Sequence, residues 1–363
     1  MSRAIELSEG RQGVASQIKT LIKMGLPEPN TWVKAPNIYG TDHELKAMIV
    51  TDMGEDYHKR DELSHSQFLK FREEPEIFAE KYLGEPDPDM DKPHFKFGRE
   101  AEHVLFYGEL PFATACTPRD VMSKRRRSKN WFEENEVEYD ENDPDHHTYA
   151  KAGNKYHEWV KGAKESHEKS GDPRPLKILT EKEYEADVQP LLDLEKNCRE
   201  HEQARRLIWG EGVRHLAVVF TCPYTGVYLR CQLDIASAGR IVVDYKTCAR
   251  NDEWKYAMDF ERWGYHIQST WYSEAIRQLT GETDYWPVVY IAQEKESKCW
   301  IVEVYEIDEE WIEIGHFEWK DELAHFKTCA QTNVWKRRSH NKVIRLRPPV
   351  YKINEFKRRK ANA

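Results

Sequence analysis

The stretch VYLRCQLDIASAGRIVVDYKTC (residues 227–248) decides the fold, because it reads as two β-strands joined by a tight turn. Both halves are rich in β-branched and aromatic residues, and the turn residues 238–240 are centred on a glycine. The segment LAVVFT (216–221) has the same composition and comes directly before the turn CPYTG. We therefore expect consecutive antiparallel strands from about residue 216 to residue 248.

The register of this hairpin predicts which side chains face one another. A three-residue loop places Ile235 opposite Val243 and Asp234 opposite Asp244. Alternation then gives one face Leu229, Cys231, Leu233, Ile235, Val243 and Tyr245, and gives the other Arg230, Gln232, Asp234, Asp244 and Lys246. We interpret the first face as core and the second as the face that carries chemistry.

Two facing carboxylates repel each other unless a cation lies between them, so Asp234 and Asp244 predict a divalent metal site. Carboxylate and water oxygens suit Mg²⁺ or Mn²⁺ better than zinc. Lys246 lies two residues beyond Asp244 and on the same face, where it would hold or deprotonate an attacking water. This pattern is typical of phosphodiester hydrolysis. The alternative is a solvated strand face with an incidental mixture of Asp and Lys.

Helical patterns surround the hairpin. Two short helices are expected within residues 63–84, with Ser64 or Ser66 as the N-cap and Pro75 at the break or in the first turn of the second. Further helical periodicity covers residues 97–107, 181–210 and 262–281. In the last of these, Gln268 and Tyr272 lie one turn apart, on a face that either contacts nucleic acid or is an ordinary half-buried helix face.

Charge is unevenly distributed in a chain of 363 residues with 55 Lys and Arg against 64 Asp and Glu, a net charge of −9. The segment 124–129 reads KRRRSK, and the chain after Trp335 is strongly basic. Its cations are Lys336, Arg337, Arg338, Lys342, Arg345, Arg347, Lys352, Lys357, Arg358, Arg359 and Lys360. This segment is either a polyanion-binding tail or a solvated end.

Several classes of protein are excluded by what the chain does not contain. The seven cysteines include no C-x-x-C pair, which argues against a disulfide framework, a zinc ribbon or a clustered iron–sulfur site, so we expect reduced core thiols. No run of 18 apolar residues and no signal peptide appear, so we expect a cytoplasmic protein without a membrane partner. The sequence contains neither a phosphate-loop pattern nor a dinucleotide-binding glycine pattern, so we expect no nucleotide cofactor.

The chain is expected to consist of three parts. Residues 1–60 would form an N-terminal arm or accessory segment, residues 61–350 the main domain, and residues 351–363 a basic C-terminal tail. Within the main domain, residues 118–175 are charged and rich in Asp, Asn and Pro, which predicts a helix-bearing excursion with a loop.

A family resemblance connects these parts. The segments LSHSQFLKF and EEPEIFAEKY, then FGREAEHVLF, LRCQLDIA, VVDYKT, YHIQSTWY and LRPPVY, follow one another in an order that resembles the PD-(D/E)XK nuclease superfamily. The chain is most similar to RecE-like (exonuclease VIII-like) phage recombination nucleases and, more distantly, to lambda-type exonuclease. The resemblance implies an α/β, restriction-endonuclease-like core, in which a central mixed β-sheet is flanked by helices.

The resemblance also implies roles for individual residues. Asp234 would fill the first acidic position, and Asp244 with Lys246 would form the D-x-K signature. Gln268 and Tyr272 fall on the family's Gln-x-x-x-Tyr helix. We expect Ser66, Arg230, Gln268 and Tyr272 to contact DNA.

The helical metal ligand is where the chain departs from the family pattern. A Gly followed four residues later by His, or by Glu in lambda-like members, is usual, whereas here Gly98 is followed by Glu102, with His103 one position later. Spacing favours Glu102 as the ligand, and residue type keeps His103 as the alternative. A second departure is His215, where relatives often carry an acid, which leaves one or two metals open.

The function expected from the resemblance is a Mg²⁺-dependent DNA exonuclease, with Mn²⁺ as a substitute, that degrades one strand of a duplex from an end during phage-type recombination or repair. A single-strand annealing protein would then be a partner, and the rings of lambda-like relatives imply a homo-oligomer by analogy. Two alternatives stay open. One is a structure-specific or restriction-type endonuclease on the same core, and the other is a non-catalytic DNA-binding or scaffold protein.

Overall fold

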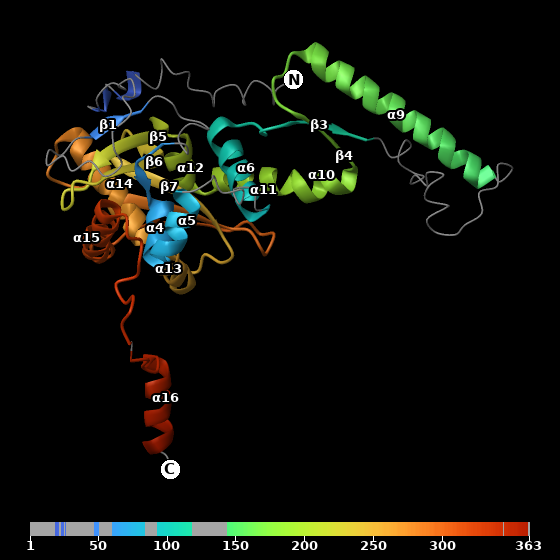
Figure 1. The fold of residues 1–363 in the computed structure, drawn as a ribbon. Coiled ribbons are helices and arrows are strands. Elements are labelled where there is room, and N and C mark those ends of the chain that lie inside the picture. Colours follow the sequence, from blue (N-terminus) through green and yellow to red (C-terminus); the bar gives the residue numbers. More distant parts are fainter. Residues whose placement is uncertain are drawn as a thin grey trace.

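The computed structural model describes residues 19–21, 23–24, 26, 47–50, 60–83, 93–117, 144–343 and 345–361, excluding the side chains of residues 93–95, 144–155, 350 and 361. The fold is α/β, with a central mixed sheet flanked by helices (Figure 1). Most of the expected N-terminal arm and the whole KRRRSK segment lie outside the described residues.

The central sheet has seven strands in the order β1-β5-β6-β7-β8-β9, with β2 paired to β6. Their bounds are β1 (Ala47–Ile49), β2 (Leu63–Ser64), β5 (Gly212–Thr221), β6 (Tyr228–Ser237), β7 (Ile241–Cys248), β8 (Val288–Glu294) and β9 (Val302–Glu306). The β7–β8 and β2–β6 pairs are parallel and the other pairs antiparallel. The predicted strands around the hairpin are thus confirmed, whereas β8 and β9 were not predicted.

The helices are α4 (His65–Glu73), α5 (Pro75–Tyr82), α6 (Pro93–Tyr107), α9 (Pro144–Ser170), α10 (Glu181–Asp187), α11 (Gln189–Glu200), α12 (Glu202–Trp209), α13 (Glu253–Arg262), α14 (Tyr265–Thr280), α15 (Glu309–Thr332) and α16 (Val350–Ala361). Of the two candidate N-caps, Ser64 is the one that caps α4, through a capping box with Gln67. Pro75 begins α5, and Gly281 ends α14 with a φ of 69°.

Helices cover both faces of the sheet. Val242 on β7 packs with α4, α5, α14 and α15, while its neighbour Val243 packs with α6, α11 and α12. Because successive residues of a strand point to opposite faces, these are two core layers on the two sides of the sheet. On the first side, α15 crosses α14 at Gly315, where a Cβ would overlap Thr270 Oγ1.

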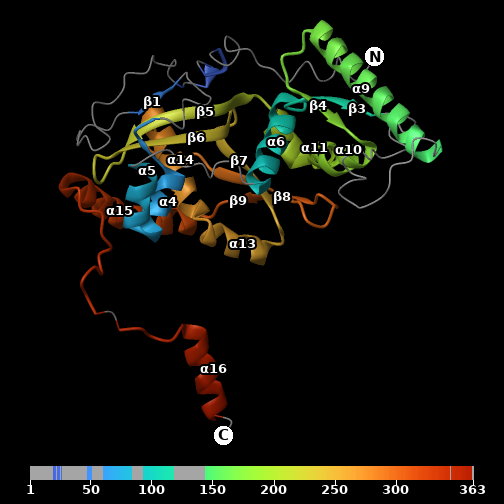
Figure 2. The ribbon, with the colours of Figure 1, turned by 45° about the vertical axis from the view of Figure 1, so that its right-hand side comes forward.

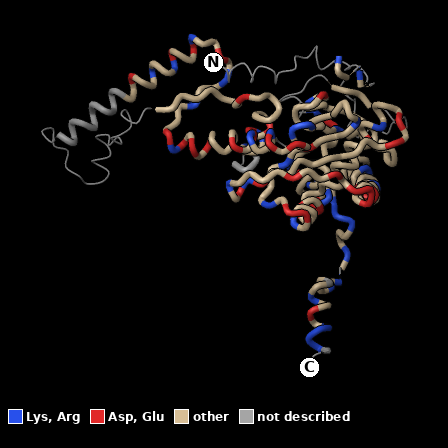
Figure 3. Tube along the Cα trace, turned by 180° about the vertical axis from the view of Figure 1, so that it is seen from behind, with Lys and Arg blue, Asp and Glu red and all other residues tan. Residues whose placement is uncertain are grey.

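A smaller unit lies to one side of the main sheet. Strands β3 (Ala113–Cys116) and β4 (Leu176–Leu179) form a parallel pair, and α9 lies beside it (Figures 1 and 2). Helix α9 lies within residues 118–175, where the sequence predicted a helix-bearing excursion, and the two strands flank that region. At the other end of the chain, α16 projects from the body behind an extended segment, and Figure 3 shows its Lys and Arg residues along it.

All seven cysteines are free thiols in the structure. Five are buried as expected, but Cys116 and Cys299 are exposed, so the prediction of core thiols is wrong for these two. Within the described part of the chain, no helix combines the length and apolar character that a membrane span requires.

Candidate functional site

The β6–β7 hairpin carries the two predicted carboxylates. Ile235 lies opposite Val243, as the sequence predicted, but the ladder ends at this pair and does not include Asp234 and Asp244. Instead, the backbone N–H of Tyr245 donates a hydrogen bond to Asp234 Oδ2 at 2.8 Å. The strands part at this point, and the Asp234 side chain takes the place of the missing backbone acceptor.

The face assignment predicted for the hairpin is wrong in one respect. Leu233 packs in the core layer of α4 and α14, whereas Ile235 packs in the layer of α6 and α11, so the alternation is interrupted at Asp234. On the neighbouring strand β5, the ladder skips His215, whose φ of 53° is left-handed. Both faces of the sheet are covered by helices, so the face of Asp244 and Lys246, which the sequence predicted to carry chemistry, is packed as well.

Asp244 is fully buried and held from two sides. The Tyr272 hydroxyl on α14 donates a hydrogen bond to its Oδ1 at 3.0 Å, and the Lys246 ammonium forms an ion pair with its Oδ2. Burial raises the pKa of Asp244 to about 7, and the Asp234 carboxylate adds to the rise, while Lys246 opposes it. Burial likewise raises the pKa of Asp234. These carboxylates therefore carry negative charge at a high energetic cost.

Lys246 stands at the centre of this charge distribution. Burial alone would lower its pKa, but the Asp244 and Asp234 carboxylates outweigh burial and raise the pKa above its ordinary value. Its Nζ also lies 5.5 Å from the centroid of the Tyr265 ring. In this environment Lys246 is an ammonium, which favours holding a negatively charged or polar group over accepting a proton.

Glu102 on α6 belongs to the same electrostatic cluster. Burial raises its pKa to about 8, with Asp234 and Asp244 adding to the rise and Lys246 opposing it. The helix approaches the sheet at Gly98, one turn earlier, where a Cβ would lie 3.6 Å from Thr247 Oγ1 on β7. Gly98 and Glu102 thus share the face of α6 that is turned to the hairpin.

His103 is turned away from this cluster. Its ring lies 4.8 Å from the Tyr107 ring, which stacks in turn on His215 at 5.6 Å. Burial lowers the pKa of His215 to about 4, so this imidazole is neutral. The structure therefore brings Glu102 together with Asp234, Asp244 and Lys246, and places His103 in an aromatic stack on the neighbouring face of α6.

The four residues expected to contact DNA are in different environments. Tyr272 is buried against Asp244, and Arg230 is buried with hydrogen bonds to Arg60 O at 3.1 Å and to Gln67 Oε1 at 3.3 Å. The Gln268 side chain is half-buried, and its Oε1 accepts a hydrogen bond from a neighbouring tyrosine hydroxyl. Ser66 is exposed in the first turn of α4.

Sequence reasoning missed Gln293, the residue that fixes β7 from its other face. Its Oε1 accepts hydrogen bonds from the Tyr245 hydroxyl at 2.8 Å and from Cys198 Sγ at 3.1 Å. Its Nε2 donates to the backbone carbonyls of Leu194 and Trp300. Because the Tyr245 N–H holds Asp234, this buried amide supports the site indirectly. A lone Gln in the apolar strand VVYIAQE was the signal that would have identified it.

The residues present fit a hard divalent cation. Glu102, Asp234 and Asp244 are carboxylates, the ligands that Mg²⁺ and Mn²⁺ prefer, and burial raises the pKa of all three, so a bound cation would favour their ionised forms. As the side chains stand, however, no three His, Cys, Asp or Glu residues in the described ranges converge closely enough to hold an ion. Lys246 occupies Asp244 Oδ2, so metal binding requires this oxygen to be shared or released.

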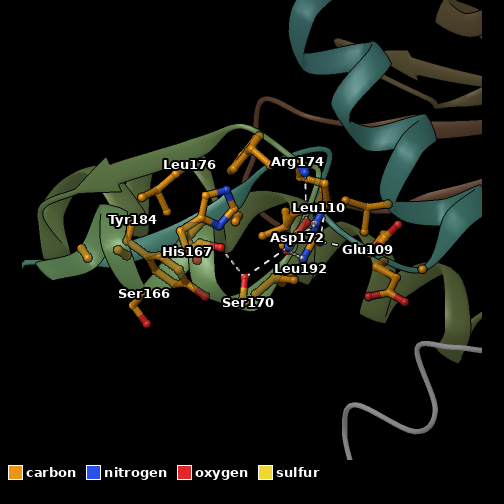
Figure 4. Close-up of a pocket in the computed structure, with 18 residues that line it drawn as sticks. Glu109, Leu110, Ser166, His167, Ser170, Asp172, Arg174, Leu176, Tyr184 and Leu192 are labelled. Carbon is orange, nitrogen blue, oxygen red and sulfur yellow. Dashed lines mark hydrogen bonds and ion pairs between the residues drawn. The ribbon is translucent and has the colours of Figure 1, made fainter. Parts of the chain in front are cut away.

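A pocket of about 560 Å³ lies elsewhere, between the end of α6, the β3–β4 pair and α9 (Figure 4). Its principal charged group, Arg174, is paired with Asp172 and with Glu109 at 3.3 Å, and donates to Leu110 O at 3.1 Å. These interactions tie the loop after α9 to the end of α6. The pocket does not include the carboxylates of the hairpin, so we do not assign the chemistry to it.

Comparison with known proteins gives a family and a structural likeness. The family model described as "PDDEXK-like domain of unknown function (DUF3799)" matches residues 132–343, which include Asp234, Asp244, Lys246 and Tyr272 but not Glu102. No curated protein matches the chain. A crystal structure from Eubacterium rectale, described as a "Putative exonuclease", is 13% identical, with a TM-score of 0.49 over 83% of this chain and 96% of that chain.

Proposed function

Because this chain belongs to the family of PDDEXK-like domains of unknown function (DUF3799), we propose that it is a divalent-metal-dependent nuclease. The observation that carries the proposal is the buried cluster of Glu102, Asp234 and Asp244 around the Lys246 ammonium. Buried ionisable groups with strongly shifted pKa values are concentrated at catalytic sites, where the chemistry requires them. We assign the nuclease domain to residues 61–350.

The finer proposal is a DNA exonuclease that hydrolyses one strand of a duplex from an end, in phage-type recombination or repair. It rests on the order of the motifs from the Ser64 helix to the late LRPPVY segment, which resembles the RecE-like nucleases. Single-strand annealing proteins are the partners that such a product calls for, and a homo-oligomer is proposed on the same resemblance.

Each residue of the cluster has a proposed role. Glu102, Asp234 and Asp244 would hold Mg²⁺, with Mn²⁺ as a substitute. When bound, the metal supplies Lewis-acid polarisation of the phosphodiester and lowers the pKa of water. Lys246, as an ammonium, would orient the attacking water or hold the charge that develops on the phosphate. Tyr272 and the Tyr245 N–H are positioning groups that fix Asp244 and Asp234.

The experiment compares linear duplex DNA with covalently closed circular DNA of the same sequence, each incubated with the purified protein and Mg²⁺. Digestion of the linear form alone is the expected result, because an exonuclease requires an end. Cleavage of the circular form would instead support the endonuclease alternative on the same core. Binding of both forms without cleavage of either would support the non-catalytic alternative.

A further inference from the structure

Three large apolar side chains are exposed on or next to α13, the helix that comes directly after strand β7. Trp254, Met258 and Trp263 are 70%, 53% and 52% exposed, although tryptophan is seldom left this open on a protein surface. Trp254 and Met258 lie one turn apart, and Trp263 is the C-cap of the helix. In Figures 1 and 2, α13 lies at the periphery of the body, beneath the sheet.

Trp263 is close in sequence to the residues around Lys246. Gly264 follows Trp263 with a φ of 68°, and next comes Tyr265, whose ring lies 5.5 Å from Lys246 Nζ. The Gly264 carbonyl accepts a hydrogen bond from His65 Nε2 at 3.0 Å. A Cβ at Gly264 would overlap the Leu69 side chain, so the junction is tightly packed. Trp263 is thus two residues away from a side chain that lies beside Lys246.

The side chains around Trp263 are better suited to binding bases than to binding phosphates. The Arg262 guanidinium carbon lies 5.1 Å from the centroid of the Trp263 ring, which makes a cation–π pair. Asp259 and Glu261 on the same helix offset the neighbouring cations, so the helix is not a basic stripe. Aromatic faces bind nucleobases by stacking, and this interaction is tolerant of base sequence and does not require net positive charge.

We propose that Trp263, backed by Arg262, is a stacking platform for an unpaired base of the strand that enters the active site. This inference rests on the proposed nuclease function and adds a substrate feature to it. Base faces inside a duplex are already stacked on one another, so a solvent-exposed indole can stack either on an unpaired base or on the outer face of a terminal base pair. The proposal commits to the unpaired base, with the strand single-stranded at this position, and titration of the duplex distinguishes the two.

The test measures binding without cleavage. A fluorescein-labelled oligothymidylate, alone or annealed to oligodeoxyadenylate, is titrated with the protein in EDTA. Trp263→Ala is expected to weaken binding of the single strand by about tenfold or more, the usual scale for removing the aromatic partner of one stacked base. The same substitution should change duplex binding much less. Trp263→Phe, which keeps an aromatic face, should retain most of the affinity.

The matched control is Trp254→Ala. This tryptophan is more exposed than Trp263, but it lies nine residues earlier, roughly 13 Å along the helix axis. It should leave single-strand binding unchanged. Equal effects of the two substitutions, no effect of Trp263→Ala, or an equal loss for single strand and duplex would overturn the inference. An effect on partner-protein binding with nucleic-acid binding intact would do so as well.

The result separates this inference from the proposed function. Since EDTA removes cleavage from the measurement, a protein that proves to have no nuclease activity can still show Trp263-dependent binding of the single strand. Conversely, a protein that digests DNA while its Trp263→Ala variant binds the single strand normally keeps the proposed function and loses only the stacking platform.

Discussion

The hydroxyl of Tyr272 donates a hydrogen bond to Asp244 Oδ1 at 3.0 Å, and both side chains are buried. The bond joins α14 to the centre of the sheet and fixes which Asp244 oxygen is left to face Lys246. It also explains why a tyrosine one turn after Gln268, which the sequence linked to DNA, is instead turned inward. Its role in the structure is to hold a proposed metal ligand.

Replacement of Tyr272 by Phe tests this role. The variant keeps the ring and its packing but loses a hydrogen bond to a carboxylate, and removal of such a ligand-orienting group typically costs about 10- to 100-fold in metal affinity or activity. We expect Mg²⁺ affinity, measured by calorimetry, to fall within that range. The control is Tyr256→Phe on α13, because the Tyr256 hydroxyl makes no hydrogen bond with any described residue. Equal metal affinity in both variants would contradict the positioning role.

Glu102 and His103 are neighbours that the helix directs about 100° apart, so one alone can face the hairpin squarely. Burial and the nearby carboxylates of the cluster raise the pKa of Glu102, whereas His103 packs against Tyr107. We therefore expect Glu102→Gln to lower Mg²⁺-dependent cleavage by at least about 100-fold, on the scale expected when a metal ligand is removed. His103→Asn should cost much less. The reverse order of the two effects, in a comparison of initial rates, would identify His103 as the ligand.

The raised pKa values predict how stability depends on pH in the absence of metal. Glu102 has an ordinary pKa of 4.5 and a folded-state pKa of about 8. Between these values the folded protein binds more protons than the unfolded chain, so stability falls as the pH rises towards 8. In EDTA, the wild type should lose unfolding free energy relative to Glu102→Gln as the pH rises from about 4.5 to about 8.

Mg²⁺ provides the second arm of that measurement. The cation binds the ionised cluster, so it should stabilise the wild type more at the higher pH than at the lower one. Glu102→Gln should show a smaller stabilisation at both. A pH-independent difference between the wild type and the variant, by urea unfolding in EDTA, would show that Glu102 is not held in its protonated form.

The C-terminal segment should contribute to DNA binding and not to catalysis. Lys336 pairs with Glu76 on α5 and Arg337 with Glu74, the residue that precedes α5, so the first cations of the basic segment are already neutralised. The cations after Tyr351 lie on α16, away from the body. Deleting the residues after Tyr351 should reduce the slope of log K against log salt by about 0.9 for each DNA phosphate that these cations neutralise in the full chain. An unchanged slope, in binding titrations at several salt concentrations, would show that the segment is only a solvated end.

The hairpin could be predicted in detail because its signals are local. Three loop residues between strongly β-forming segments fix the pairing of Ile235 with Val243, and the capping box at Ser64 is likewise contained within four residues. The interruption at Asp234 could not be predicted, since it depends on the left-handed backbone of His215 on another strand.

The rest of the site was hidden because it is assembled across the sheet. The apolar strand around Gln293 indicates a buried amide, but the sequence does not indicate that this amide bonds Tyr245 on β7 and two carbonyls from other segments. Burial, which turns Tyr272 and Arg230 inward, likewise depends on packing against elements that are distant in sequence. The residue types of the proposed metal ligands were thus readable from the sequence, and the groups that hold them in place were not.

The proposed metal-dependent nuclease activity is tested most directly by the release of acid-soluble nucleotides from linear duplex DNA. The wild type and Asp244→Asn are compared, each with Mg²⁺ and with EDTA. Asp244→Asn keeps the shape of the side chain but removes the charge that the cluster needs to hold a metal. We expect the wild type to release nucleotides with Mg²⁺ and not with EDTA. Its release should be at least about 1,000-fold faster than that of the folded variant, and both proteins should still bind DNA. Release that persists in EDTA, or near wild-type release by Asp244→Asn, would contradict the proposed activity.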